Sequence, residues 1–138
     1  SRLIAESAAY LAGKFGASMH LVFVVQNFED YSGFFVPQMT LPSLEGELAE
    51  SAETKMASFC SEMVDFCKEA GVADLTYKVL MGDVGEKIVD YAAEIEADLI
   101  VMGTREGFLS KNTIGSTIKS VMRKSQIPVM VVPPVEDK

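Results

Sequence analysis

Residues 97–104 read ADLIVMGT, a short apolar run that ends at a glycine, and residues 127–132 read IPVMVV. Short runs without alternating polar residues are typical of parallel strands that helices cover on both faces. Between the two runs, residues 116–124 carry a helical pattern. This part of the chain therefore predicts strand, helix and strand, the unit from which such a sheet is built.

The same alternation extends back to the start of the chain. Helices are predicted over residues 1–15, 44–70 and from 82 onward, because apolar residues recur there at spacings of three, four and seven. Strands are predicted over residues 19–25 and 75–81. The whole pattern predicts a single α/β domain over residues 1–138, a three-layer sandwich with a mainly parallel sheet.

Charge and hydropathy exclude several classes of protein. The 138 residues include 12 basic and 20 acidic side chains, a formal net charge of -8, so general binding to nucleic acid or anionic lipid is not expected. The apolar runs are far shorter than the ~18 residues of a membrane span, and no signal-peptide pattern opens the chain. We therefore expect a cytoplasmic protein without a membrane segment.

The two cysteines are consistent with a cytoplasmic protein. Cys60 and Cys67 lie seven residues apart on a predicted helix, which separates them by about 10 Å along its axis, too far for a disulfide. We interpret them as reduced core thiols rather than as a redox or metal site.

Candidate binding residues follow from the sheet, because ligands of open α/β sheets bind beyond the carboxyl ends of the strands. Gly115, Ser116 and Thr117 open a helix with no acid in its first turn, where amides, a hydroxyl and the helix dipole favour a phosphate. The alternative is that Ser116 only caps the helix. Gly103 follows a strand, where a missing Cβ either lets a ligand approach or allows a tight turn.

Residues 97–104, Gly115-Ser116 and 127–132 resemble the universal stress protein family, and residues 82–83 and 88–92 fit it too. The resemblance covers nearly the whole chain. It implies an adenine nucleotide alpha hydrolase-like fold with a five-stranded parallel sheet of order 3-2-1-4-5, and a homodimer through the last strand, Val129 to Val132. The family's first, central strand is absent from this sequence, and we expect it to precede Ser1 in the native protein. Its absence would leave a gap of about 10 Å in the sheet.

The family contains members that bind ATP and members that do not. The binders resemble Gly-x2-Gly-x9-Gly-Ser/Thr. In this sequence Gly103 and Gly115-Ser116 match that pattern. Glu106 stands where the second glycine is expected, Gly107 comes one place late and the loop is one residue short. The resemblance implies ATP or AMP as ligand, with Mg²⁺ as a candidate metal. The predicted nucleotide-binding residues are Val25, Met81, Gly82, Met102, Gly103, Arg105, Gly107, Gly115, Ser116 and Thr117. The alternative is a dimeric interaction module that binds no nucleotide.

Two further features leave alternatives open. The segment 26–42 is long and rich in apolar residues, which suggests a lid, a surface for a protein partner, or packing onto the chain's own core. No Walker lysine loop, paired catalytic carboxylates or triad around His20 is present, so we expect at most slow ATP hydrolysis. Fold analogy alone supports a hydrolase or ligase.

Overall fold

The computed structural model describes residues 2–26, 41–104 and 115–133, and within residues 41–48 it describes the backbone only. Helices and strands alternate in the order α1 (Arg2–Phe15), β1 (Ser18–Val25), α2 (Leu41–Ala70), β2 (Asp74–Met81), α3 (Val84–Glu94), β3 (Ile100–Gly103), α4 (Ser116–Lys124) and β4 (Val129–Val132). The predicted elements are confirmed. Helix α2 begins three residues earlier than predicted, which Pro42 permits because a helix tolerates proline in its first turn.

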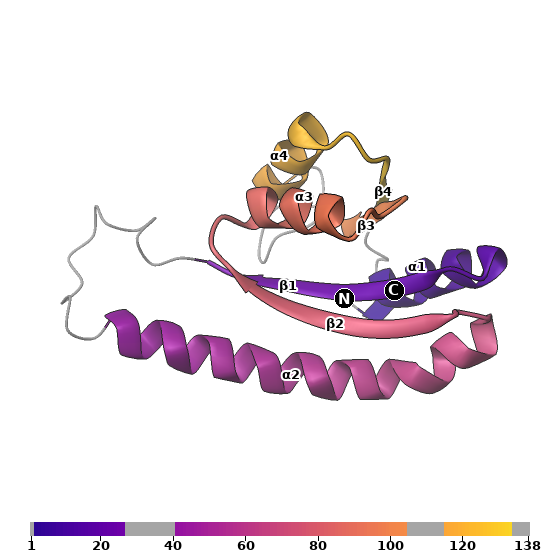
Figure 1. Cartoon of the computed structure of the whole chain (residues 1–138), viewed down its shortest axis with the longest axis horizontal. Coiled ribbons are helices and arrows are strands. Elements are labelled where there is room, and N and C mark those ends of the chain that lie inside the picture. Colours follow the sequence, from indigo (N-terminus) through magenta and orange to yellow (C-terminus); the bar gives the residue numbers. More distant parts are fainter. Residues whose placement is uncertain (1, 27–40, 105–114, 134–138) are drawn as a thin grey trace, which may run out of the picture.

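The elements form the layers of an α/β sandwich. Helix α2 runs along one face of β1 and β2, and α3 and α4 lie on the opposite side of these strands (Figure 1). Helix α1 packs against α2 and β1. All strand pairs in the described residues are parallel, as the apolar strands predicted. None of the described helices is both long and apolar enough to cross a membrane.

The strands form two separate sheets rather than one. Strand β1 pairs with β2 from Ser18↔Asp74 to Val25↔Met81, and β3 pairs with β4 from Ile100↔Val129 to Gly103↔Val132. Within the described part of the chain, β1 and β3 have no other strand neighbour. This is the interruption expected when the central strand of the family sheet is missing. Helix α1 contacts both β1 and β3 and so links the two sheets.

Each sheet has its own buried core. The first core lies among α1, β1 and α2 and contains Ala9 and Met63, both fully buried. The second lies among α3, β3 and α4 and contains Ala92, Ile100 and the fully buried Val121. Met63 and Cys67 on α2 and Ala92 on α3 are among the buried residues on the inward faces of these helices.

Two glycines allow helices to approach closely. A Cβ on Gly13 of α1 would overlap the carbonyl group of Ala70 at the end of α2. A Cβ on Gly85 of α3 would lie 2.5 Å from Oγ of Ser120 on α4. Both distances are shorter than those that a real Cβ atom keeps from its neighbours, so a side chain at either position would force the helices to shift.

Candidate functional site

The predicted residues at the carboxyl ends of β1 and β2 form one group. Val25 and Met81 are register partners, and the amide of Gly82 donates a 2.9 Å hydrogen bond to the Val25 carbonyl. Gly82 has a φ of 135°, a conformation that favours glycine, and so turns the chain from β2 into α3. The Val25 side chain is buried, whereas Met81 is 39% exposed at the strand end. Met81 therefore offers the accessible apolar surface of this group.

A second group joins the end of β3 to the start of α4. The amide of Gly115 donates a 3.3 Å hydrogen bond to the carbonyl of Thr104, the residue directly after β3. This bond brings Gly103 together with Gly115, Ser116 and Thr117, although at least eleven positions separate Gly103 from them in the sequence. These residues therefore lie at the carboxyl end of β3, and their binding of a ligand there stays a prediction.

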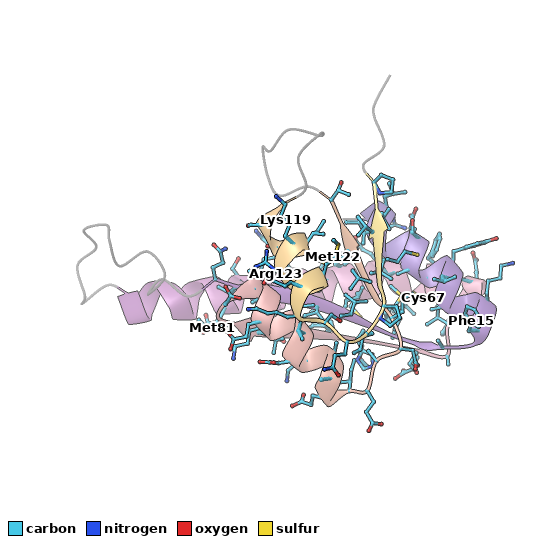
Figure 2. The ribbon with its side chains drawn as sticks, turned by 90° about the horizontal axis from the view of Figure 1, so that it is seen from above. Phe15, Cys67, Met81, Lys119, Met122 and Arg123 are labelled. Atoms are coloured by element: carbon cyan, nitrogen blue, oxygen red, sulfur yellow. The ribbon has the colours of Figure 1, made fainter. Side chains whose placement is uncertain are left out.

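The N-terminal end of α4 has the features of an anion site. Its N-cap is Gly115, which brings no side-chain hydrogen bond to the helix, and its first turn contains no acidic residue. The first hydrogen bond of the helix runs from the amide of Lys119 to the carbonyl of Gly115 at 3.3 Å, and the positive end of the helix dipole lies at this terminus. Lys119 lies near this terminus, whereas Arg123 lies in the last turn of the same helix (Figure 2). These features favour a negative ligand in an otherwise acidic chain.

The capping interpretation of Ser116 is wrong. Ser116 is the first helical residue rather than the N-cap, and its side chain is exposed. A serine at this position leaves its hydroxyl accessible at the helix terminus.

Gly103 has a packing role in this structure. A Cβ on Gly103 would lie 2.5 Å from Cδ1 of Ile4, so the side of the residue without a side chain is filled by α1. The Cδ1 atom is the flexible end of the Ile4 side chain and can move, so packing is one reason for the glycine, and its contact with a ribose stays a prediction. Met102 is half-buried and packs against the core of the second sheet.

Thr104 has a feature that the sequence could not reveal. Its Oγ1 has less than 1 Å² of accessible surface and no hydrogen-bond partner, the only such buried side-chain atom found in the described part of the chain. A hydroxyl next to a glycine loop is common, and nothing in the residue order shows that it is buried. Arg105, Gly107, Glu106 and most of the segment 26–42 lie outside the described residues.

His20 lies away from this site and has structural partners. Its Nδ1 is 3.0 Å from Oγ1 of Thr76 on β2 and 3.3 Å from Oη of Tyr91 on α3. These contacts connect β1 to β2 and α3, and neither partner is a carboxylate. In residues 2–26, 41–104 and 115–133 no group of three or more metal-ligating side chains comes together.

The two cysteines are free thiols, as predicted. Burial raises the pKa of both thiols above the ordinary value, and repulsion from Cys60 raises the pKa of Cys67 further. Cys67 is 3% exposed, whereas Cys60 is half-buried.

We therefore predict slow alkylation of both cysteines. A raised pKa lowers the thiolate fraction at pH 8, and the thiolate is the reactive form. Iodoacetamide labelling followed by peptide mass spectrometry should show both cysteines reacting more slowly than free cysteine, with Cys67 the slower of the two. Faster labelling of Cys67 than of Cys60 would contradict the buried position of Cys67.

Comparison with known proteins identifies the fold. The model of the universal stress protein family matches residues 1–133. The chain belongs to the universal stress protein family. Among solved structures, the universal stress protein UspA from Lactobacillus plantarum has a TM-score of 0.76 at 24% identity, covering 95% of this chain and 88% of UspA. A universal stress protein crystallised in complex with cAMP has a TM-score of 0.60 at 20% identity, covering 92% of this chain and 82% of that chain.

Sequence relatives match a shorter region. The stress response protein NhaX from Bacillus subtilis is 41% identical over 61 residues, which are 44% of this chain and 37% of NhaX. The match thus spans well under half the length of that relative. The family and the α/β fold predicted from residues 97–104 and 127–132 are confirmed.

Proposed function

We propose that this chain binds an adenine nucleotide, ATP or AMP, and acts as a cytoplasmic stress-response regulator. The observation that supports this most is the N-terminal end of α4, where Gly115 caps the helix without a side chain and no acid occupies the first turn. Such a terminus favours a phosphate. Two relatives add to it: NhaX is named a stress response protein, and one protein of this fold was crystallised with cAMP.

Roles for the individual residues follow from their positions. Gly115, Ser116 and Thr117 would hold the phosphates at the helix terminus, with Mg²⁺ as a candidate partner of a polyphosphate. Gly103 would lie near the ribose, and Val25 with the turn at Met81 and Gly82 would frame the adenine. Among the residues proposed to frame the adenine, Met81 has an accessible side chain, whereas the side chain of Val25 is buried. The chain's own contribution is binding and orientation by backbone amides.

The first test measures ligand-induced stabilisation. Thermal unfolding of the 138-residue chain with ATP, ADP or AMP, with and without Mg²⁺, should show a higher midpoint, because a ligand at 100 times its Kd adds about 2.7 kcal/mol to the free energy of unfolding. Ser116→Asp should weaken the affinity about ten-fold or more, since it places a carboxylate beside the phosphates.

A matched control separates this repulsion from a general charge effect. Ser58 is also an exposed serine on a helix, but it lies on α2. Ser58→Asp adds the same charge and should leave nucleotide affinity unchanged. Absence of any stabilisation of the wild-type chain by the three nucleotides would refute the proposal and favour the interaction module.

We also propose a homodimer through β4. The amide of Ile100 donates to the carbonyl of Pro128, so even-numbered residues of β4 bond to β3 and the backbone groups of Val129 and Val131 face the other edge. Unpaired strand edges pair readily with a second copy.

Proline substitution tests this edge. Val131→Pro removes an amide that the β3–β4 ladder does not use, so the fold should persist while the dimer dissociates. Sedimentation velocity measures the state, and circular dichroism checks the fold. A folded Val131→Pro dimer would contradict the interface.

A further inference from the structure

A groove lies where the C-terminal ends of α1 and α2 meet, at one end of the molecule (Figure 1). Its volume is about 390 Å³, and it is lined by Tyr10, Lys14, Phe66, Glu69 and Ala70. The two walls are held close together, because the missing side chain of Gly13 lets α1 approach the carbonyl group of Ala70. Both helices end just before β1 and β2 begin, so the groove lies near the amino ends of these strands. The residues proposed to frame the adenine lie at the opposite ends.

Aromatic side chains are exposed at this groove. Tyr10 is 62% exposed, and Phe15, at the end of the same helix, is 79% exposed (Figure 2). They are the two most exposed large apolar side chains in the described part of the chain. The half-buried Phe66 contributes a third ring from α2. Exposed rings around a groove are typical of a surface that binds a partner.

The ring of Tyr10 already contacts a cation. Nζ of Lys14 lies 5.0 Å from the centroid of this ring, within the range of a cation–π interaction. The two residues are four positions apart on α1, so the helix itself brings them together. The face of the ring is therefore accessible to a positively charged group, and in the free protein Lys14 is the group that occupies it.

Carboxylates flank the aromatic ring on the other wall. Glu62 and Glu69 lie four residues before and three residues after Phe66, which places all three on one face of α2. Both glutamates are exposed, and neither forms an ion pair with another described residue. The net charge of -8 adds long-range attraction for a basic partner. Rings beside carboxylates match arginine, whose planar guanidinium stacks on a ring and pairs with a carboxylate.

We propose that this groove binds an arginine side chain on a basic segment of a partner protein. The guanidinium displaces Lys14 from the ring of Tyr10 and pairs with the carboxylate of Glu69. The groove thus forms a protein-docking surface separate from the proposed nucleotide site. The inference does not depend on nucleotide binding, since no residue of that site lines the groove.

Titration with a model peptide tests the recognition of arginine. NMR spectra of the ¹⁵N-labelled 138-residue chain, titrated with a peptide of alternating arginine and glycine, should show shift changes centred on Tyr10, Lys14 and Glu69. A peptide with citrulline in place of arginine keeps the shape without the charge and should bind about ten-fold more weakly. Equal binding of the two peptides, or no binding of either, would overturn the proposal. Free arginine that binds as tightly as the peptide would also overturn it, because the groove would then take a small molecule.

Substitutions in the groove should change the affinity in opposite directions. Glu69→Gln removes the carboxylate and Tyr10→Ser removes the ring, and each should weaken peptide binding about three-fold. Lys14→Gln should strengthen binding about three-fold, because it vacates the ring and removes a like charge. All three side chains are exposed, so the variants should fold, which circular dichroism checks.

Matched controls separate the groove from the general attraction of an acidic protein. Glu94→Gln removes an exposed carboxylate from α3, and Lys55→Gln removes an exposed cation eleven residues before Phe66 on α2. Both should leave peptide affinity nearly unchanged. If Glu69→Gln weakens binding no more than Glu94→Gln, or Lys14→Gln strengthens it no more than Lys55→Gln, the groove is not the site and the proposal is wrong.

Sedimentation velocity of the chain without peptide tests the other possible occupant, a second copy of the chain. Tyr10→Ser should leave the oligomeric state unchanged. Dissociation of an oligomer by this substitution would assign the groove to contact between copies and overturn the proposal of an arginine-bearing partner.

Discussion

Gly13→Ala is expected to lower the free energy of unfolding by about 3 kcal/mol or more. A Cβ at this position would overlap the carbonyl carbon and oxygen of Ala70, so the obstacle is backbone rather than a movable side chain. The same crossing brings the Cβ position of Gly71 within 3.1 Å of the Gly13 carbonyl oxygen. Helices α1 and α2 would have to separate to admit the methyl group. Urea unfolding followed by circular dichroism measures the loss.

Gly16→Ala provides the matched control. Gly16 lies just after the same helix and has open space around its Cβ position, but its φ is 62°. Alanine at this position should lower the free energy of unfolding by only about 1 kcal/mol, because its Cβ strains a left-handed backbone. If Gly13→Ala costs no more than Gly16→Ala, the close approach of the two helices is relieved by a small shift and does not determine their packing.

Met63→Ala is expected to lower the free energy of unfolding by about 3 kcal/mol. Met63 is fully buried where α2 packs on α1 and β1, so truncation removes apolar contacts and leaves a cavity in the first core. Few other side chains in the described residues are so completely enclosed. The change in the urea midpoint at constant slope measures the effect.

The adjacent residue is the control for this substitution. Val64 follows Met63 on α2 but is 36% exposed, because neighbouring residues of a helix point in different directions. Val64→Ala should cost less than half as much as Met63→Ala. Equal losses would mean that the buried face of α2 is assigned incorrectly.

Part of the candidate site was predictable from the chain alone. Gly115 and Ser116 could be placed at a helix terminus because the preceding apolar strand and the following helical periodicity are local patterns. Gly103 could be named a candidate because it ends a strand, where α/β sheets bind ligands. The N-cap was less predictable: Ser116 has the better capping side chain, yet the cap is Gly115. Helix ends vary by one or two residues, so a local pattern does not determine which residue forms the cap.

Residue order determined the alternation of helices and strands, their buried faces and the family resemblance, because these depend on periodicities within one element. Only the three-dimensional packing decided that α1 fills the space beside Gly103, that Gly13 meets Ala70, and that the Thr104 hydroxyl is buried. It also decided that the strands divide into two sheets. These features arise where surfaces distant in the chain meet, and no local pattern encodes how closely two such surfaces approach.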